Sequence, residues 1–305
     1  MTRGLTEALK ARKIHYRENV LTASLCTFRI GGPARIVVEP CCVGELIEVV
    51  TLCIRLGLSY AVIGKGSNLL FDDGTIDTVL IRTVRLDALR MIPGGELCAL
   101  CGASLSSAAY LAARHGFADL CFAAGIPGSV GGGLYMNAGA HGSAMLGVPG
   151  AVRILNTDTL KIETLFNEKL NNVYRNSEFK SKKCVILDAV LHFKEHADPA
   201  AALAEIRELA ERRRALQPLD LPCAGSVFRR PSPEVALSKI LDDLGCKKMR
   251  VGGAEVSGKH AGFIVNIGGA TAQDVQALMV NIQNIVEREC GFRPSPELVM
   301  IPRDV

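Results

Sequence analysis

The sequence predicts an α+β protein with two lobes that carry glycine-rich loops and a smaller α+β lobe towards the C-terminus. Three observations lead to this class. Segments of strand length alternate with amphipathic helical segments, and two glycine-rich loops interrupt this alternation. Pro218–Pro222 marks a boundary between lobes. We expect lobes at residues 1–82, 83–198 and 199–292, with a tail, 293–305, that returns to the first lobe. At 305 residues the chain is long enough to give them well-formed cores.

Apolar or alternating segments define the expected strands, and helical periodicity with end signals defines the expected helices. Gly116 is expected to end one helix, and Thr271 with Asp274 to begin another. We expect Arg212–Arg214 to be the solvated last turn of a charged helix. The strands are expected at Ala34–Pro40, Ser59–Ile63, Val79–Arg82, Glu96–Leu100, Ala151–Asn156, Lys161–Phe166, Cys184–Phe193 and Gly262–Asn266, and the helices at Val43–Leu56, Ser104–His115, Pro199–Leu216, Ser232–Leu244 and Thr271–Cys290.

The segment from Ala123 to Gly142 is the most informative part of the chain. It contains seven glycines and no formal charge if His141 is neutral. Because each glycine inside a regular element costs about 0.5–1 kcal/mol relative to alanine, we expect irregular backbone here rather than a helix or strand. Bare N–H groups in such a loop can bind a large flat or phosphorylated ligand. A tight structural crossover between two sheets is the alternative.

Two familiar nucleotide motifs are excluded by the glycine spacing. A Walker loop ends in Gly-Lys-Ser/Thr, whereas Gly131 is followed by two glycines, and Gly66 follows Gly64-Lys65. The dinucleotide pattern G-x-G-x-x-G also fails, because the position of its third glycine is occupied by Met136 in one loop and by Leu69 in the other. A nucleotide bound here does not use a P-loop or Rossmann frame.

Composition and charge argue against several functional classes. The net charge of +4 and the 5% aromatic content do not suggest a nucleic-acid surface. We find no signal peptide and no membrane span, so we expect a cytoplasmic protein and, for its assembly, a monomer. The eleven cysteines are scattered, which favours a reducing compartment over a disulfide framework. Cys98 and Cys101 form a C-x-x-C that is better explained as buried strand residues, Cys41-Cys42 is expected to form a turn, and we expect no metal site.

The glycine-rich loops belong to an ordered series of distinctive motifs. In chain order they are Phe28–Ala34 (FRIGGPA), Gly64–Leu70 (GKGSNLL), Gly125–Gly132 (GIPGSVGG), Met136–Gly142 (MNAGAHG), Tyr174–Ser177 (YRNS), Ala224–Phe228 (AGSVF) and Ala254–Asn266 (AEVSGKHAGFIVN). From about residue 20 to the end, this series closely resembles the UDP-N-acetylenolpyruvoylglucosamine reductases, the MurB family. The resemblance implies the FAD-binding fold of the vanillyl-alcohol oxidase and p-cresol methylhydroxylase type in two lobes, with the C-terminal lobe binding a UDP-sugar.

The resemblance implies FAD as the bound cofactor and NADPH as its reductant. In the family, NADPH shares the channel of the substrate, which implies that the two compete. Lys65 stands where the family often has glycine, so its side chain either adds a cation near the phosphates or points to solvent. The implied FAD-binding residues are Gly64, Lys65, Gly66, Ser67, Asn68, Leu69, Gly125, Ile126, Pro127, Gly128, Ser129, Gly131, Gly132, Asn137, Ala138 and Gly139.

Three residues match the catalytic residues of the family. Ser226 matches the serine that protonates the substrate, and Arg175 matches the cation beside its carboxylate, for which a guanidinium fork is well suited. Glu297 matches the glutamate that polarises the enol system. Taken singly, these residues are better explained as a turn serine, a surface cation and a solvated glutamate. The ordered motif series favours the catalytic roles.

The resemblance also implies the substrate site, with UDP-N-acetylglucosamine enolpyruvate as the substrate. The implied substrate-binding residues are Tyr174, Lys259, His260 and Asn266. The chain has no tyrosine after Tyr174, so it is similar to the shorter branch of the family, which lacks an inserted tyrosine clamp over the UDP. The UDP contact then stays open among the arginines at positions 229, 230, 250 and 293. Cys223 replaces a common serine and is expected to make the activity sensitive to thiol reagents.

Two other functions remain possible at this stage. A sugar or alcohol oxidase on the same FAD fold is one, although Ser226, Arg175 and Glu297 would then share no purpose. A catalytically silent protein that binds flavin or a UDP-sugar is the other, and the presence of all three catalytic candidates argues against it. The main prediction is NADPH-dependent reduction of the enolpyruvyl sugar to UDP-N-acetylmuramate in peptidoglycan precursor synthesis.

Overall fold

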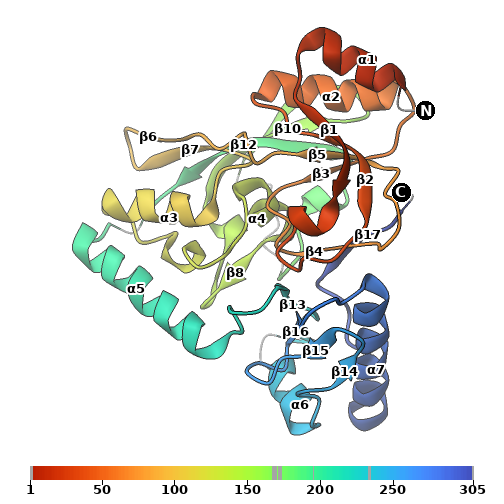
Figure 1. Ribbon diagram of the computed structural model, residues 1–305. Coiled ribbons are helices and arrows are strands. Elements are labelled where there is room, and N and C mark those ends of the chain that lie inside the picture. The colour runs from red at the N-terminus through yellow and green to blue at the C-terminus, as the bar shows by residue number, and fades with distance from the viewer. Residues whose placement is uncertain (1–2, 167–169, 171–173, 195, 233–234, 304–305) are drawn as a thin grey trace. The chain divides into compact units, whose positions relative to one another are not determined.

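The computed structural model describes residues 3–166, 170, 174–194, 196–232 and 235–303 (Figure 1). The chain forms two compact units. Unit 1 contains Met1–Arg17, Ile36–Lys65 and Val79–Arg212, and unit 2 contains Glu18–Arg35, Gly66–Thr78 and Arg213–Val305. This division groups the chain differently from the segments expected at 1–82, 83–198 and 199–292, which stay a prediction.

A four-stranded sheet with the order β1-β2-β5-β3 begins the fold. Its strands are β1 (Tyr16–Leu21), β2 (Pro33–Val38), β3 (Tyr60–Ile63) and β5 (Val79–Arg82). Both β2 and β3 pair in parallel with β5, and α2 (Val43–Arg55) connects β2 to β3, so the expected β-α-β unit is confirmed. The buried face of α2 consists of Leu46, Val49, Val50 and Cys53, and α1 (Arg3–Arg12) lies beside α2 (Figure 1).

A five-stranded antiparallel sheet with the order β11-β10-β12-β7-β6 forms the rest of the unit 1 core. Its strands are β6 (Leu89–Ile92), β7 (Glu96–Leu100), β10 (Pro149–Asn156), β11 (Ile162–Phe166) and β12 (Cys184–His192). The four segments expected as strands here are confirmed, because alternating or continuous apolar residues identified them. The alternation places Val152, Ile154 and Leu187 in the core.

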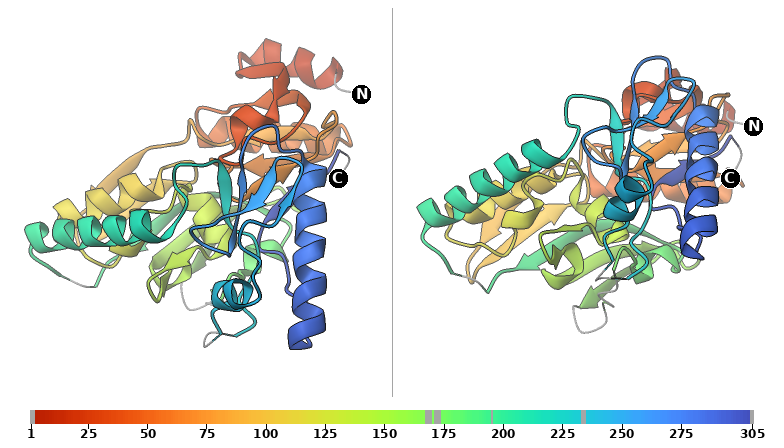
Figure 2. Two further views of the ribbon diagram at one scale, coloured as in Figure 1. Left: turned by 60° about the horizontal axis from the view of Figure 1, so that its bottom comes forward. Right: turned by 90° about the horizontal axis from the view of Figure 1, so that it is seen from below.

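Two helices of unit 1 lie side by side in Figures 1 and 2, α3 (Leu105–Arg114) and α5 (Pro199–Leu216). Ala113, Cys121, Ala202 and Ile206 form a small buried cluster that joins them. Gly116 follows α3 with a φ of 80°, as expected for the end of that helix. Shorter unit 1 elements are the 3-10 turns Cys121–Ala123, Met145–Gly147 and Glu178–Lys180, helix α4 (Val130–Met136), and strands β8 (Gly139–Ala140) and β9 (Ser143–Ala144).

Unit 2 contains a second antiparallel sheet, with the order β13-β16-β15-β14. Its strands are β13 (Cys223–Ser226), β14 (Arg250–Val251), β15 (Ala254–Val256) and β16 (Phe263–Asn266), and α7 (Ala272–Cys290) packs against β14 and β15 (Figure 2). Thr271 and Asp274 form the expected capping box of α7. The tail strand β17 (Val299–Ile301) pairs in parallel with β4 (Leu69–Phe71), and the 3-10 turn Thr22–Leu25 completes the unit.

The expectation of irregular backbone throughout the glycine segment was wrong for α4. Ser129 caps this helix, since its hydroxyl accepts a hydrogen bond from the Gly132 N–H at 3.2 Å. A Cβ on Gly131 would lie 2.8 Å from Cys101 Cβ, and one on Gly133 would lie 3.0 Å from Leu105 Cδ1. These glycines therefore permit close packing, which outweighs their poor helix propensity.

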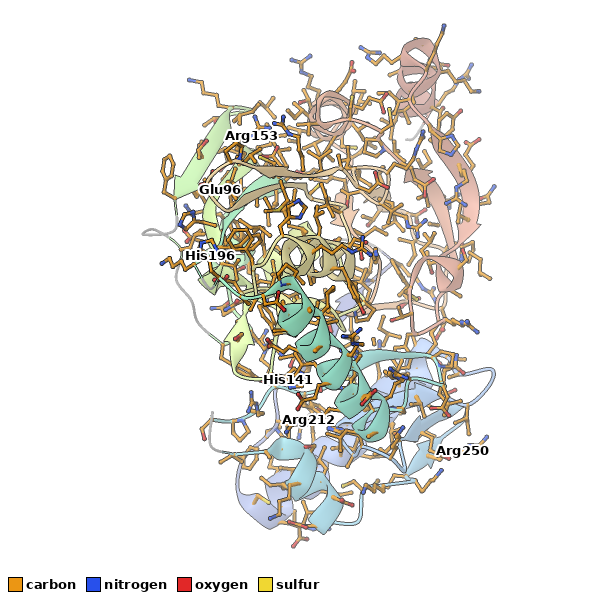
Figure 3. All side chains as sticks on the ribbon, turned by 90° about the vertical axis from the view of Figure 1, so that its left-hand side faces the viewer. Glu96, His141, Arg153, His196, Arg212 and Arg250 are labelled. Atoms are coloured by element: carbon orange, nitrogen blue, oxygen red, sulfur yellow. The ribbon has the colours of Figure 1, made fainter. Side chains whose placement is uncertain are left out.

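Two smaller expectations also need correction. The helix expected at Ser232–Leu244 is α6 (Leu237–Asp243), which begins five residues later, and residues 233–234 lie outside the described structure. The Arg212–Arg214 turn is not uniformly solvated. Arg212 is exposed near the end of α5 (Figure 3), whereas Arg213 is half-buried and burial lowers the pKa of its guanidinium. Among the described helices, none has both the length and the apolar character needed to cross a membrane.

Replacing Gly131 by alanine should destabilise the protein, although the same change usually stabilises a helix. The new methyl group would collide with Cys101, and overpacking of this kind costs about 1–3 kcal/mol. Urea unfolding of the flavin-free protein measures the change in the free energy of unfolding.

Gly132→Ala is the matched control in the same helix. Gly132 is exposed, and its Cβ would meet only Ser129 Oγ, at 3.1 Å. We expect this variant to be neutral or more stable by up to about 1 kcal/mol. Equal destabilisation of the two variants would contradict the packing argument.

Candidate functional site

The two loops expected to bind FAD meet within unit 1. Gly64 directly follows β3, and a Cβ at this position would overlap the Ser129 hydroxyl that caps α4. Only glycine fits at position 64 without moving that cap. In the second loop, Gly125, Pro127 and Gly132 are exposed. The two loops are therefore closely packed where Gly64 meets Ser129, and they are exposed at Gly125, Pro127 and Gly132.

The second half of the first loop belongs to unit 2, because the division between the units falls after Lys65. Gly66 has a φ of 69°, and its carbonyl accepts a hydrogen bond from the Thr27 N–H at 3.2 Å. The Asn68 side-chain amide donates to the Glu297 carbonyl at 3.0 Å. Asn68 thus ties a predicted FAD-binding loop to the segment that contains a predicted catalytic residue.

Arg175 is bound to the turn that follows α4. Asn137 ends α4 in the left-handed conformation, with a φ of 44°, and its buried side chain accepts a hydrogen bond from the Leu146 N–H at 3.0 Å. The Arg175 guanidinium donates to the Asn137 carbonyl at 3.3 Å and to the Gly139 carbonyl at 2.7 Å. Two residues predicted for FAD and one predicted for catalysis are therefore connected directly.

Lys180 is a part of this cluster that the sequence did not reveal. Its ammonium donates to the Arg175 carbonyl at 3.0 Å and lies 5.9 Å from the centre of the Tyr135 ring. Arg175 has a φ of 50°, a conformation that few non-glycine residues adopt, and its guanidinium lies 5.1 Å from the centre of the Tyr174 ring. The position of Lys180, five residues after Arg175, carries no motif by itself.

In unit 2, Glu297 is hydrogen-bonded to the residue that follows Ser226. Ser226 ends β13, pairs with Phe263 and follows Gly225, which has a φ of 75°. The Glu297 N–H donates to the carbonyl of Val227, the residue after Ser226, at 2.7 Å. Ser226 and Glu297 are both half-buried. The hydrogen bond joins Val227 to Glu297, which lie 70 positions apart in the chain, and no local sequence pattern could predict it.

The residues around Ser226 include a half-buried thiol and a half-buried guanidinium. Burial raises the pKa of Cys223, partly offset by a hydrogen bond from the Gly225 backbone and by the charge of Arg213. The carbonyl of Cys223 accepts a hydrogen bond from the Thr27 hydroxyl at 2.7 Å. At neutral pH the thiol is therefore protonated and weakly nucleophilic.

The predicted substrate residues of unit 2 have contacts within the fold. The Asn266 amide donates to the Phe28 carbonyl at 3.3 Å and accepts from the Gly268 N–H at 3.0 Å. His260 Nδ1 accepts from the Gly262 N–H at 3.1 Å, and burial lowers the pKa of His260. Lys259 is exposed and its ammonium contacts the Arg214 carbonyl. Substrate contacts of these residues stay a prediction.

The candidate arginines for the UDP differ in their surroundings. Arg250 Nε donates to the Gly252 carbonyl at 2.6 Å, and the side chain lies at the surface (Figure 3). Arg293 donates to Glu287 at 2.6 Å. Arg229 is half-buried, and its buried Nε has no hydrogen-bond partner in the described structure. An unpaired buried donor is costly, which makes Arg229 the best of these candidates for an anionic ligand.

The chain closely resembles known reductases over almost its whole length. It is 40% identical to the UDP-N-acetylenolpyruvoylglucosamine reductase of Caldicellulosiruptor bescii over 295 residues, which cover 96% of this chain and 93% of that protein. The chain belongs to the UDP-N-acetylenolpyruvoylglucosamine reductase family. The family resemblance found in the motif series is confirmed.

Further comparisons agree with this MurB family assignment. Residues 217–301 match the family profile for the C-terminal domain of UDP-N-acetylenolpyruvoylglucosamine reductase, and residues 34–152 match an FAD binding domain. The enzyme of Enterococcus faecalis is 37% identical over 91% of each chain. The crystal structure of MurB from Thermus caldophilus has a TM-score of 0.79 and 28% identity, and covers 95% of this chain and 99% of that chain. The predicted FAD-binding fold is confirmed.

The described residues fit a flavin nucleotide. The FAD domain match includes both predicted FAD-binding loops and α4. Gly132 is exposed, and a Cβ on it would meet only the Ser129 hydroxyl. The bare backbone here leaves room for a flat or phosphorylated group. The loops Gly64–Leu69 and Gly125–Gly139 lie inside this domain match and stay the predicted FAD-binding residues. The role of each side chain stays a prediction.

Acidic pH should destabilise the protein partly through His260. Since burial lowers its folded pKa below the ordinary 6.5, the neutral ring stabilises the fold fully above pH 6.5, and this contribution is lost as the pH falls below that value. The free energy of unfolding, measured in urea at about pH 7.5 and about pH 5.5, should fall less in His260→Gln than in the wild type.

His141→Gln is the control for this experiment. His141 is exposed on the turn between β8 and β9 (Figure 3), so its replacement should leave the pH dependence of the wild type in place. The same pH dependence in His260→Gln and the wild type would contradict the assignment.

Proposed function

We propose that this protein catalyses the NADPH-dependent, FAD-mediated reduction of UDP-N-acetylglucosamine enolpyruvate to UDP-N-acetylmuramate, a step of peptidoglycan precursor synthesis. Membership of the reductase family supports the reaction. At the residues, the observation that carries the proposal is the hydrogen bond from Glu297 to Val227. It ties Glu297 to the residue after Ser226, and the proposed reaction needs the chemistry of both Ser226 and Glu297, whereas an oxidase would not.

The chemistry requires a proton donor, an anion partner and a polarising group. FAD held here would supply the hydride chemistry, by which a hydride taken from NADPH would reach the CH₂ carbon of the enolpyruvyl group. The neighbouring carbon then carries negative charge that extends into its carboxylate, and it must be protonated. Ser226 donates that proton, Arg175 stabilises the carboxylate charge, and Glu297 polarises the enol system.

Ser226 needs help in this role, because a serine hydroxyl is a poor acid in water. Its half-buried position at the end of β13 limits access of bulk water. Gly225, which is in the left-handed conformation, precedes Ser226, and the next residue, Val227, accepts the hydrogen bond from the Glu297 N–H. A proton that Ser226 gives to the substrate would be replaced from solvent after each turnover.

The UDP group requires a cation, and Arg229 is our choice. It follows Ser226 by three residues, its N–H binds the Ser295 carbonyl at 2.9 Å, and its buried Nε is unpaired in the described structure. A diphosphate oxygen would satisfy that donor. Lys259 and Tyr174 remain in the proposed substrate set, together with His260 and Asn266.

We also infer a cytoplasmic monomer. All eleven cysteines are free thiols, which supports a reducing compartment. NADPH and the UDP-sugar are cytoplasmic metabolites in the proposed reaction. Sedimentation equilibrium of the FAD-loaded protein would show a larger mass if the monomer is wrong.

The decisive experiment follows the flavin spectrum under anaerobic conditions. NADPH should bleach the wild-type protein, and UDP-N-acetylglucosamine enolpyruvate should then restore the oxidised spectrum. Ser226→Ala should bleach normally but reoxidise about 10²–10⁴-fold more slowly, because the substrate carbon lacks its acid.

Each other outcome has a distinct meaning. Rapid reoxidation by oxygen, with none by the enolpyruvyl sugar, would indicate an oxidase. Protein that cannot take up FAD would contradict every flavin-dependent function. Equal reoxidation of wild type and Ser226→Ala would leave the reaction in place and remove Ser226 as the acid.

Alkylation at Cys223 should inactivate the enzyme slowly at neutral pH and faster in alkali, since burial raises the pKa of this thiol. The rate of inactivation by iodoacetamide, measured across pH, checks this expectation. Cys290→Ser removes an exposed thiol in α7 and should not protect the enzyme. A Cys223→Ser enzyme that is as sensitive as the wild type would show that another cysteine is responsible.

A further inference from the structure

The first turn of α2 brings three metal-ligating side chains together. The sulfur atoms of Cys41 and Cys42 and a carboxylate oxygen of Glu45 all lie within 4.8 Å of one another. Cys41 and Cys42 are exposed, and Glu45 is half-buried. No other such group occurs among the described residues. None of the three belongs to the predicted FAD, catalytic or substrate residues.

Hydrogen bonds fix these side chains before any ion is present. Glu45 Oε2 accepts from the Cys41 N–H at 2.8 Å, and Glu45 Oε1 accepts from the Cys41 thiol at 3.2 Å. Cys42 caps α2, with its sulfur accepting from the Glu45 N–H at 3.5 Å. The Cys41 proton lies between sulfur and oxygen, the position where a cation would bridge the same two atoms.

The dimensions suit a small tetrahedral ion. With Zn–S distances of about 2.3 Å and Zn–O distances of about 2.0–2.2 Å, neighbouring ligand atoms stand about 3.3–3.8 Å apart. Cys41 Sγ and Glu45 Oε1 are already 3.2 Å apart. The Cys42 sulfur must approach the other two ligand atoms by about 1 Å at most, and rotation of the exposed cysteine side chains can provide this.

The donor set selects the class of ion. Two sulfurs and one carboxylate suit a thiophilic divalent cation, whereas Ca²⁺ takes six to eight oxygen ligands and iron–sulfur clusters take four cysteines. Arg85, which interacts with Cys41 and donates to the Glu39 carbonyl at 3.5 Å, is a nearby cation that repels the ion.

We propose that Cys41, Cys42 and Glu45 bind one thiophilic divalent cation, with Zn²⁺ as the reference ion and a solvent molecule as the fourth ligand. The site is separate from the proposed reaction. Binding replaces the shared Cys41 proton, so one or two protons leave as the ion enters. The bound ion would connect the end of the β2 segment to the first turn of α2.

The test is equilibrium dialysis of the FAD-loaded protein against Zn²⁺, with the thiols kept reduced and bound metal measured by elemental analysis. The wild type should bind one ion at this site. The double variant Cys41→Ser/Cys42→Ser should lose that ion or bind it about 100-fold more weakly, and Glu45→Gln should weaken it about tenfold. Cys290→Ser, which removes the other exposed thiol, should bind as the wild type does.

The outcomes separate a site from scattered thiol binding. Unchanged binding in the double variant, or an equal loss in Cys290→Ser, would overturn the proposal. Loss in the double variant with no effect of Glu45→Gln would reduce the site to a pair of thiols and contradict the three-ligand assignment. NADPH bleaching of the flavin in the double variant, measured in parallel, shows that the fold is intact.

Discussion

The close approach of α4 to the segment that follows β7 is the interaction on which unit 1 depends. The Gly131 N–H donates to the Cys101 carbonyl at 2.7 Å, and the Val130 N–H donates to the Ala103 carbonyl at 2.8 Å. These bonds require the absence of a side chain at Gly131. They fix the Ser129 cap against Gly64 at one end of α4, and at the other end they fix Asn137, to which Arg175 is bound.

Unit 2 depends on polar contacts across large sequence separations. Asn266 is buried and uses its amide for the Phe28 and Arg29 carbonyls, while its oxygen accepts from Gly268 and Ala270. The Asp73 carboxylate accepts from the first N–H groups of α7. A buried polar side chain with all its groups satisfied specifies one arrangement, because any other leaves a donor or acceptor unpaired. Asn266 lies in β16, the strand that pairs with β13 and Ser226.

Most strands and helices could be predicted from the sequence because their signals are local. Alternation located β10, β11 and β12, and the Thr271–Asp274 pattern located the start of α7. The helix α4 escaped prediction because its glycines are explained by Cys101 and Leu105, which lie more than twenty residues earlier. Propensity alone could not reveal that contact.

The residue types of the candidate site could be predicted from the sequence, but the contacts between those residues mostly could not. The ordered motifs identified the family, and they supplied the candidate FAD loops and the catalytic candidates. Lys180 and Arg213 were missed, since a lysine after a turn and an arginine at a helix end are ordinary surface residues until their contacts are known. The burial of Arg213 beside Cys223 depends on two segments that no periodic pattern relates.

The pairing of β17 with β4 has a consequence for how the chain is made. Val299 pairs with Leu69 and Ile301 with Phe71, so β4, formed early in synthesis, waits for a partner that is made 230 residues later. Glu297 arrives with that partner, two residues ahead of Val299. Contacts this distant form late in folding, because the intervening chain must first be ordered. A nascent chain that stalls before residue 296 would therefore leave β4 unpaired, a form suited to capture by chaperones or proteases.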